Sequence, residues 1–279
     1  DFVPCAFNDP LFILFSSGTT GKPKCIVHGV GGTLLQHLKE HQLHCNLSDK
    51  DTLFYYTTCG WMMWNWMVSA LASNVSLVLF DGAAISNHTS IWDLIYSYEI
   101  TVFGCSASFI GASQKRKIEI ASKLSNQTTR LILSTGSPLL PHHYEYLYSS
   151  FEYPVQVGSI SGGTDIISCF ALCNPLTPVY SGVLQGKGLG MDIVALNDDH
   201  PVIGIKGDLV CQMSAPCMPI YFLKDEGKKR YKASYFKEGA VKQWYHGDYI
   251  IIHPDGSLEI LGRSDSTLNP GGIRIGTAE

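Results

Sequence analysis

The sequence predicts an α/β fold that ends in a β-rich part. Over residues 11–157, short apolar runs alternate with helical patterns, which is typical of largely parallel sheets covered by helices. After about residue 189, short apolar runs are separated by Gly, Pro and Asp turns, which favours antiparallel strands. Hydrophobic residues make up 45% of the 279 residues and charged residues 16%, so apolar side chains suffice for a buried core.

The apolar runs predict strands at residues 11–15, 25–28, 53–56, 75–80, 100–103, 131–134 and 155–157. Helical patterns lie at residues 32–43, 61–72, 92–98, 118–124 and 142–150, the first with Leu34, Leu35 and Leu38 on one side. The β-rich part is expected to hold strands at residues 193–196, 209–211, 249–252 and 258–261. Residues 253–257 (HPDGS) indicate a hairpin between the last two of these strands.

Charge and hydropathy argue against two classes of partner. The net charge is −4 and the cations are scattered, whereas a nucleic-acid surface needs a basic stripe. Residues 52–80 carry no charge, so a membrane span is an alternative interpretation of that stretch. Polar residues interrupt it, however, and a helix, a turn at Ser73 and Asn74 and a buried strand explain it better.

The nine cysteines are dispersed and contain no CxxC pair, so neither a zinc ribbon nor a disulfide framework is indicated. They favour free thiols in a reducing compartment, and we therefore expect a cytosolic protein. The sequence lacks a starting Met and a secretory signal. We expect both ends to be cut and the chain to be a fragment of a longer protein.

The strongest chemical signal is the sequence SSGTTGKPK at residues 16–24, which directly follows a predicted buried strand. Such a loop brings backbone N–H groups, hydroxyls and two ammonium groups into one small volume, as a nucleotide polyphosphate requires. It is not the GxxxxGK[ST] loop, because its glycines are three apart and Pro23 follows Lys22. By composition alone, a solvated polar turn is the alternative.

The whole nine-residue sequence resembles the phosphate loop of the adenylate-forming superfamily of acyl-CoA synthetases. Further segments match motifs of that superfamily in the same order: residues 158–165 (GSISGGTD), 207–210 (GDLV), 216–219 (PCMP), 245–248 (YHGD), 262–265 (GRSD) and 269–279. Within the superfamily, residues 14–21, 55–58, 60–66, 133–139 and 158–169 resemble the acetoacetyl-CoA synthetase family.

The resemblance implies a fold and a division into domains. Residues 1–262 correspond to the adenylate-forming N-terminal core, with α/β parts at residues 1–100 and 101–189 and a β-rich part at residues 190–262. Residues 263–279 correspond to the hinge, at Asp265, and to the start of a C-terminal domain that is mostly missing.

The resemblance also implies a reaction. It implies an ATP-dependent ligase that joins acetoacetate to coenzyme A through an acyl-adenylate, with Mg²⁺ as cofactor. The implied partners are these small molecules, with no nucleic acid and no membrane span. The truncated chain itself is expected to be weakly active or inactive. Acetyl- or propionyl-CoA synthetase, or a nucleotide-binding fragment without catalysis, are the alternatives.

Residue by residue, the resemblance implies a phosphate site and an adenosine site. The expected contacts to the β- and γ-phosphates are Ser16, Ser17, Gly18, Thr19, Thr20, Gly21, Lys22 and Lys24. Thr164 would donate to the α-phosphate, and Asp165 would hold Mg²⁺ where the superfamily usually has Glu. Asp248 and Arg263 would bind the ribose, Gly136, Ser137 and Pro138 would line the adenine, and Arg274 would approach the phosphate.

The aromatic sequence WMMWNW at residues 61–66 is expected to serve two purposes. By resemblance, Trp61 would form a wall of the acyl pocket and Gly158 would also contact substrate, whereas Trp64 and Trp66 are expected in the core. Two other polar features have structural explanations. His41 and His44 are expected on a helix surface, and the charge run at residues 224–232 is expected to be a solvated loop.

Overall fold

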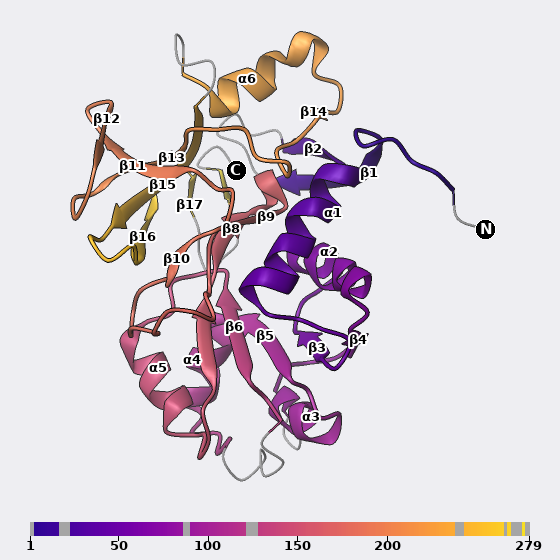
Figure 1. The fold of residues 1–279 in the computed structure, drawn as a ribbon, viewed down its shortest axis with the longest axis vertical. Helices are drawn as coiled ribbons and strands as arrows, with labels where there is room; N and C mark the ends of the chain where they lie inside the picture. The colour runs from indigo at the N-terminus through magenta and orange to yellow at the C-terminus, as the bar shows by residue number, and fades with distance from the viewer. Residues whose placement is uncertain are drawn as a thin grey trace.

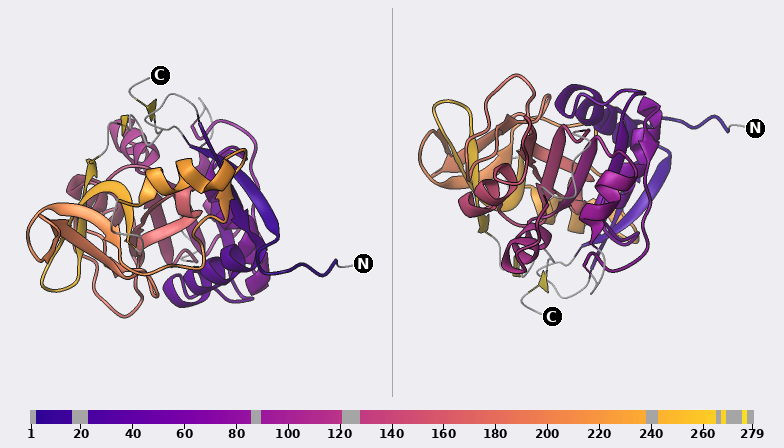
Figure 2. Two further views of the ribbon diagram at one scale, coloured as in Figure 1. Left: turned by 90° about the horizontal axis from the view of Figure 1, so that it is seen from above. Right: turned by 90° about the horizontal axis from the view of Figure 1, so that it is seen from below.

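The computed structural model describes residues 3–16, 23–85, 90–120, 128–237 and 243–264, and the backbone of residues 267–268 and 275–276. Figure 1 shows a parallel sheet with its helices in the lower half and an antiparallel sheet at the upper left. A small sheet and helix α6 (Lys229–Tyr235) lie at the top. Seen from above and below, the N-terminal helices and the antiparallel sheet lie on opposite sides (Figure 2).

The central sheet is parallel throughout, as the alternating pattern predicts. Its order is β4 (Ser76–Leu77), β3 (Thr52–Tyr55), β5 (Val102–Ser106), β6 (Leu131–Thr135) and β7 (Gln156–Ser159). Leu131 and Leu133 face one apolar cluster and Ile132 faces the other, so β6 is buried on both faces. The predicted division at residue 100 passes through this sheet, because β3 and β4 precede it.

Helices cover both faces of the sheet. Helices α3 (Ile91–Ser97), α4 (Ala107–Lys115) and α5 (Pro141–Tyr148) pack on one face. Helix α2 (Met62–Ser69), which continues as the 3₁₀ turn η2 (Ala70–Ser73), packs on the other. Local chemistry starts several of them: Ser90 and Asp93 form a capping box at α3, and Pro141 is the first residue of α5.

Two predicted elements were wrong in part. The helix expected at residues 118–124 is not seen at residues 118–120, and residues 121–127 lie outside the described chain. The helix in this region is α4, where Ser106 caps the Phe109 amide and small residues hide the apolar period. The strand expected at residues 75–80 is only β4, because the chain leaves the sheet after Leu77.

The first helix buries the side opposite to the one its leucines occupy. Helix α1 (Val30–Lys39) continues as a π-helix, η1 (Glu40–His44). Leu34 and Leu35 are 38% and 53% exposed, whereas the polar side chains of this segment are buried: Thr33, Gln36, His37, Glu40, His41 and His44. The expectation that His41 and His44 lie on a helix surface was therefore wrong. A π-helix is rare and often marks a functional segment.

The β-rich part is antiparallel, as predicted. Its order is β12 (His200–Val202), β11 (Ile193–Asn197), β13 (Gly207–Cys211), β15 (Trp244–Ile252) and β16 (Leu258–Arg263). The hairpin at residues 253–257 is confirmed, since the His253 amide donates to the Ser257 carbonyl at 2.8 Å. A separate small sheet has the order β10 (Gly186–Lys187), β9 (Ser168–Leu172) and β8 (Ser161–Gly163).

The remaining strands form two further antiparallel sheets. Strands β1 (Pro10–Ser16), β2 (Lys24–Gly29) and β14 (Tyr221–Phe222) form one, so the predicted phosphate loop connects two adjacent antiparallel strands. Strands β17 (Thr267–Leu268) and β18 (Ile275–Gly276) form the other.

The charge run at residues 224–232 is not a solvated loop. It forms the 3₁₀ turn η5 (Glu226–Lys228) and the first half of α6. The Asp225 carboxylate accepts hydrogen bonds from the amides of Arg230 and Tyr231, and these bonds fix the start of α6. Charged side chains point outward, while Tyr235 is buried.

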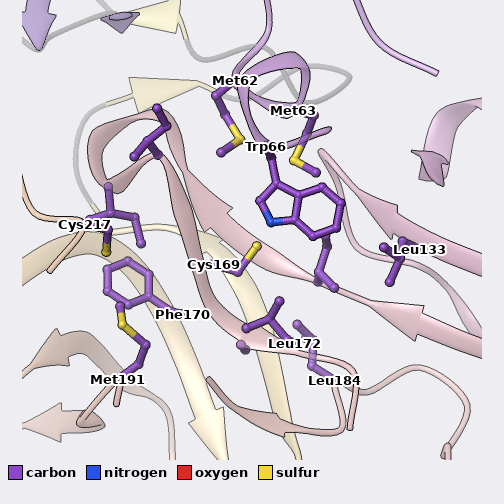
Figure 3. Packing of buried hydrophobic residues seen from close by; sticks show 14 of the residues in the cluster. Met62, Met63, Trp66, Leu133, Cys169, Phe170, Leu172, Leu184, Met191 and Cys217 are labelled. Atoms are coloured by element: carbon purple, nitrogen blue, oxygen red, sulfur yellow. The ribbon is translucent and has the colours of Figure 1, made fainter. Parts of the chain in front are cut away.

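Among the described residues, no helix combines the length and the apolar character needed to cross a membrane. The uncharged stretch instead forms α2, η2 and β4. Its side chains Met62, Met63 and Trp66 pack against Cys169 and Leu172 of β9 and Leu133 of β6 in the largest buried cluster (Figure 3). Trp66 is fully buried, as expected for a core residue.

Candidate functional site

The predicted site residues follow the carboxyl ends of neighbouring parallel strands. Trp61 comes after β3, Gly136 directly after β6, and Thr164 shortly after β7. Adjacent parallel strands end at one edge of a sheet, which is where ligands bind in folds of this kind. A Cβ atom at Gly136 would lie 3.6 Å from the Trp61 ring, so the predicted adenine segment and the predicted acyl-pocket wall are neighbours.

The segment around Gly136 is accessible to a ligand. Gly136 has φ +90°, a conformation that favours glycine. Gly136 and Ser137 are half-buried and Pro138 is exposed. Trp61 caps the start of α2, is half-buried, and meets the Tyr55 ring edge-to-face at 6.1 Å.

At the predicted phosphate end of the site, the structure brings together Lys24 of β2 and Asp165 of the 3₁₀ turn η4 (Thr164–Ile166). The Lys24 ammonium donates to Asp165 Oδ1 at 2.7 Å. The Asp165 side chain is fully buried and the Lys24 side chain is 13% exposed. A buried carboxylate is stable only when an opposite charge or hydrogen-bond donors compensate it. Lys24 therefore stabilises the charged form of Asp165 inside the site.

Thr164 is held from the side by a buried histidine. His28 Nε2 donates to the Thr164 carbonyl oxygen at 3.1 Å. Burial lowers the pKa of His28 to about 4, so the ring is neutral at pH 7. A neutral ring that donates from Nε2 carries no proton on Nδ1, and Nδ1 has no hydrogen-bond partner among the described residues.

The turn after Asp165 is strained, and side chains from the end of α1 and from the π-helix η1 support it. Ile167 has φ 47°, which is rare for a β-branched residue. His37 Nε2 donates to the Ile167 carbonyl at 2.5 Å. Glu40 Oε1 accepts from Ser168 Oγ at 2.5 Å and from the Cys169 amide at 3.3 Å. These contacts hold the backbone that follows the turn, and thereby the positions of Thr164 and Asp165 within it.

At the predicted ribose end of the site, Asp248 of β15 and Arg263 of β16 are register partners. Arg263 Nη1 donates to Asp248 Oδ1 at 2.8 Å, and both side chains are largely buried. His246 Nε2 lies 3.5 Å from Asp248 Oδ2. A carboxylate fixed in this way suits a diol, whose two hydroxyls both donate.

The phosphate and ribose ends are close to each other. A Cβ atom at Gly163, next to Thr164, would lie 3.1 Å from the His246 ring. Trp244 Nε1 donates to His246 Nδ1 at 3.4 Å. Residues near 24, 164 and 246 thus meet at one place, as a single nucleotide would require.

Several predicted residues lie elsewhere or outside the described chain. Ser16 ends β1, and its buried Oγ has no partner among the described residues. A Cβ atom at Gly158 would lie 2.6 Å from Cys173 Cβ, so this glycine permits β7 to pack tightly. Outside the described residues are Ser17, Gly18, Thr19, Thr20, Gly21, Lys22, Asp265 and Arg274.

A metal ion at this site would depend on the nucleotide. Within the ranges that the structure describes, no group of three or more His, Cys, Asp or Glu side chains could hold a metal. Asp165 alone fits Mg²⁺, which is commonly bound by one or two carboxylates together with substrate phosphates. The Lys24 ammonium at 2.7 Å shows that a cation is accommodated beside this carboxylate.

Sequence reasoning missed Tyr235, Trp244 and His246. Tyr235 donates from its hydroxyl to Asp165 Oδ1 at 2.5 Å, and its ring stacks on Trp244 at 3.6 Å. His246 lies inside the YHGD segment that matches a superfamily motif, and this position could have identified it as a site residue. Tyr235 lies at the end of a charge run and carries no comparable signal.

A family model described as AMP-binding enzyme matches residues 2–215. The chain belongs to the AMP-binding enzyme family. The match confirms the resemblance that the ordered motifs predict.

Individual relatives agree with the narrower resemblance. The chain is 51% identical over 275 residues to acetoacetyl-coenzyme A synthetase of Rhizobium meliloti, covering 98% of this chain and 42% of that protein. It is 49% identical over 282 residues to acetoacetyl-CoA synthetase of Gallus gallus, covering 100% of this chain and 42% of that protein. A malonamoyl-CoA synthetase of Penicillium aethiopicum is 44% identical over 299 residues, with 100% and 40% covered.

A solved structure confirms the predicted fold class. Acetoacetyl-CoA synthetase from Streptomyces lividans matches with a TM-score of 0.89 and 41% identity, over 98% of this chain and 43% of that chain. The chain thus spans less than half the length of the relatives it matches. The domain bounds predicted at residues 189 and 262 remain predictions.

Proposed function

We propose that this AMP-binding family member is, in its natural full-length protein, an acid–CoA ligase that activates acetoacetate. The proposal is supported above all by the Lys24–Asp165 ion pair, near which Gly163 approaches the His246 ring beside Asp248, in a chain 51% identical to an acetoacetyl-coenzyme A synthetase. ATP and acetoacetate react first, the acid carboxylate attacking the α-phosphorus to form acyl-adenylate and diphosphate. The thiol of coenzyme A then displaces AMP and forms the thioester.

The residues have distinct proposed roles in adenylation. Residues 16–22 and Lys24 hold the β- and γ-phosphates, and Thr164 donates its hydroxyl to the α-phosphate. Fixed donors of this kind stabilise the charge that develops on phosphate oxygens. Mg²⁺, held by Asp165 and by phosphate oxygens, would neutralise part of that charge when bound. Arg274 approaches the same phosphate.

The remaining residues orient the two organic ends. Asp248 accepts from the ribose hydroxyls, and Arg263 holds Asp248 and faces the same sugar. Residues 136–138 line the adenine. Trp61 and Gly158 border the acyl pocket, and Asp265 serves as the hinge toward the rest of the protein.

Acetoacetate is proposed as the acid substrate because of a chemical feature that the acyl groups in the relatives' names share. An acetoacetyl group and a malonamoyl group both have a carbonyl at C3 and differ only in carrying a methyl or an amino group beyond it. Relatives named for each are 51% and 44% identical to this chain. A pocket that donates a hydrogen bond to the C3 carbonyl discriminates against acids that lack it, because its donor is left unpaired.

We propose the cytosol as the location. All nine cysteines fall within the described residues, and each is a free thiol. Free thiols in such number suit a reducing compartment.

The test uses the natural full-length protein that contains this chain. ATP–diphosphate exchange is measured with acetoacetate, malonamate, butyrate, propionate and acetate. We expect acetoacetate to give the highest kcat/KM and butyrate at least ~10-fold less, since butyrate lacks only the C3 carbonyl oxygen. A higher kcat/KM for acetate or propionate would reject acetoacetate as the substrate. Absence of exchange with every acid would reject the ligase function.

A further inference from the structure

Helix α6 carries one side chain into the phosphate site. The Tyr235 hydroxyl donates to Asp165 Oδ1 at 2.5 Å, the oxygen that also accepts from the Lys24 ammonium at 2.7 Å. Lys24 Nζ lies 3.5 Å from the Tyr235 hydroxyl and 4.8 Å from the centre of its ring. Three segments that are far apart in the chain therefore meet at one carboxylate oxygen.

Tyr235 is held rigidly in this position. Its ring is parallel to the Trp244 indole, with centroids 3.6 Å apart and an interplanar angle of 15°. The rings of Phe222 and Tyr231 pack around it edge-to-face at 5.8 and 5.6 Å. Tyr235 is 2% exposed and Trp244 is fully buried. The hydroxyl thus has little freedom to leave Asp165.

The hydroxyl has a specific effect on the ion pair. The Lys24 ammonium sits at the end of a flexible side chain, whereas the Tyr235 hydroxyl is attached to a rigid ring. A donor on a rigid ring restricts rotation of the carboxylate about its Cβ–Cγ bond and, through the carboxylate, the position of the Lys24 ammonium. Groups that stabilise phosphate charge are effective only when they are oriented before the reaction.

We propose that Tyr235 is a positioning residue of the phosphate site, whose hydroxyl orients the Asp165 carboxylate and, through it, the Lys24 ammonium. This inference rests on the proposed function, because it assigns Lys24 and Asp165 to the phosphates. Tyr235 itself acts without contacting the nucleotide.

The experiment compares two conservative variants in the natural full-length protein. Tyr235→Phe keeps the ring on Trp244 and removes the hydroxyl. Tyr231→Phe is the matched control, because Tyr231 lies one turn earlier and packs on the same Trp244, at 6.3 Å. We expect Tyr235→Phe to lower kcat for ATP–diphosphate exchange roughly tenfold, less than the ~10²-fold of a directly contacting donor. The KM for the acid should stay unchanged, as should all parameters of Tyr231→Phe.

A second background separates positioning from a general structural effect. In an Asp165→Asn protein, Tyr235→Phe should cause almost no further loss, because the hydroxyl acts through the carboxylate. An Asp165→Ala background serves the same purpose if Asp165→Asn does not fold, because it also removes the carboxylate through which the hydroxyl acts. An undiminished second tenfold loss in these backgrounds, a wild-type rate in Tyr235→Phe, or an equal loss in Tyr231→Phe would each overturn the inference.

Failure of the proposed function gives a different result. Without exchange by the unaltered protein, the readout is the rise in unfolding temperature caused by ATP with Mg²⁺. Tyr235→Phe should reduce that rise and Tyr231→Phe should not. If ATP does not stabilise the unaltered protein, or stabilises both variants equally, Tyr235 has no role in a phosphate site.

Discussion

The indole Nε1 of Trp66 donates a 2.8 Å hydrogen bond to Oε2 of the fully buried Glu40. Oε1 of the same carboxylate accepts from Ser168 Oγ and the Cys169 amide, in the strand that follows Asp165. Trp66 belongs to the helix that Trp61 caps. One side chain of the π-helix therefore connects the proposed acyl-pocket helix with the proposed phosphate turn.

Replacing this carboxylate should destabilise the fold. In Glu40→Gln, the NH₂ group of the new amide would replace one carboxylate oxygen and face either the Trp66 indole N–H or the Ser168 hydroxyl. That buried group would then lose its hydrogen-bond acceptor. We expect a loss of about 2 kcal/mol in the free energy of unfolding, measured with urea. Glu152→Gln, on the exposed surface, is the control and should change it by less than ~0.5 kcal/mol. A neutral Glu40→Gln would contradict the network.

The close approach at Gly162 should tolerate no side chain. A Cβ atom there would lie 1.9 Å from the Ser168 backbone oxygen, and backbone cannot move aside as a side-chain end can. We expect Gly162→Ala to cost more than ~2 kcal/mol of unfolding free energy. In Gly186→Ala the new methyl group meets nothing within 4 Å, and stability should change by less than ~1 kcal/mol. Equal stabilities of the two variants would show that β8 and β9 are farther apart.

His28 should make stability depend on pH. Its pKa is about 4 in the folded state, lowered mainly by burial, against 6.5 for a free imidazole. Between these values the unfolded chain binds the extra proton, so stability falls as pH drops from about 6.5 to 4, by up to about 3 kcal/mol from this residue. Above pH 7 the ring is neutral in both states and contributes no pH dependence.

The measurement is urea unfolding at several pH values. Because other buried histidines add to the total slope, the informative quantity is the difference between variants. We expect the slope of unfolding free energy against pH to fall by up to one proton in His28→Gln. A slope unaltered in His28→Gln would mean that folding does not lower the pKa of His28.

The ion pair at the phosphate end should be essential for adenylation. We expect Lys24→Ala or Asp165→Ala in the natural full-length protein to lower ATP–diphosphate exchange ~10²-fold or more, because each removes an oriented charge. Lys50→Ala is a suitable control, since Lys50 is exposed in the turn that precedes β3. An unchanged exchange rate in Lys24→Ala or Asp165→Ala would show that the replaced residue has no role in adenylation.

Much of the site could be predicted from the sequence because its signals are local. The SSGTTGKPK, YHGD and GRSD segments and the hairpin at residues 253–257 are all short and self-contained. In the structure, a shift of register between Tyr249 and Ile250 then places Asp248 opposite Arg263, which the hairpin signal alone does not predict. The strand at residues 11–15 forms as predicted, but the expectation that it is buried was wrong, because Leu11, Ile13 and Phe15 are 44%, 45% and 65% exposed. The same local patterns determine the alternation of strands and helices, and with it the parallel sheet.

The tertiary structure alone decided which side of α1 is buried and what surrounds Asp165. The leucines of α1 predict an apolar buried side, yet Gln36, His37 and Glu40 are buried, because distant donors and acceptors satisfy them. Tyr235 reaches Asp165 across 70 residues of sequence. A polar group can be buried without a large energetic cost only where a hydrogen-bond or ion-pair partner is present. Here the packing of distant segments provides that partner, and no local sequence pattern encodes this packing.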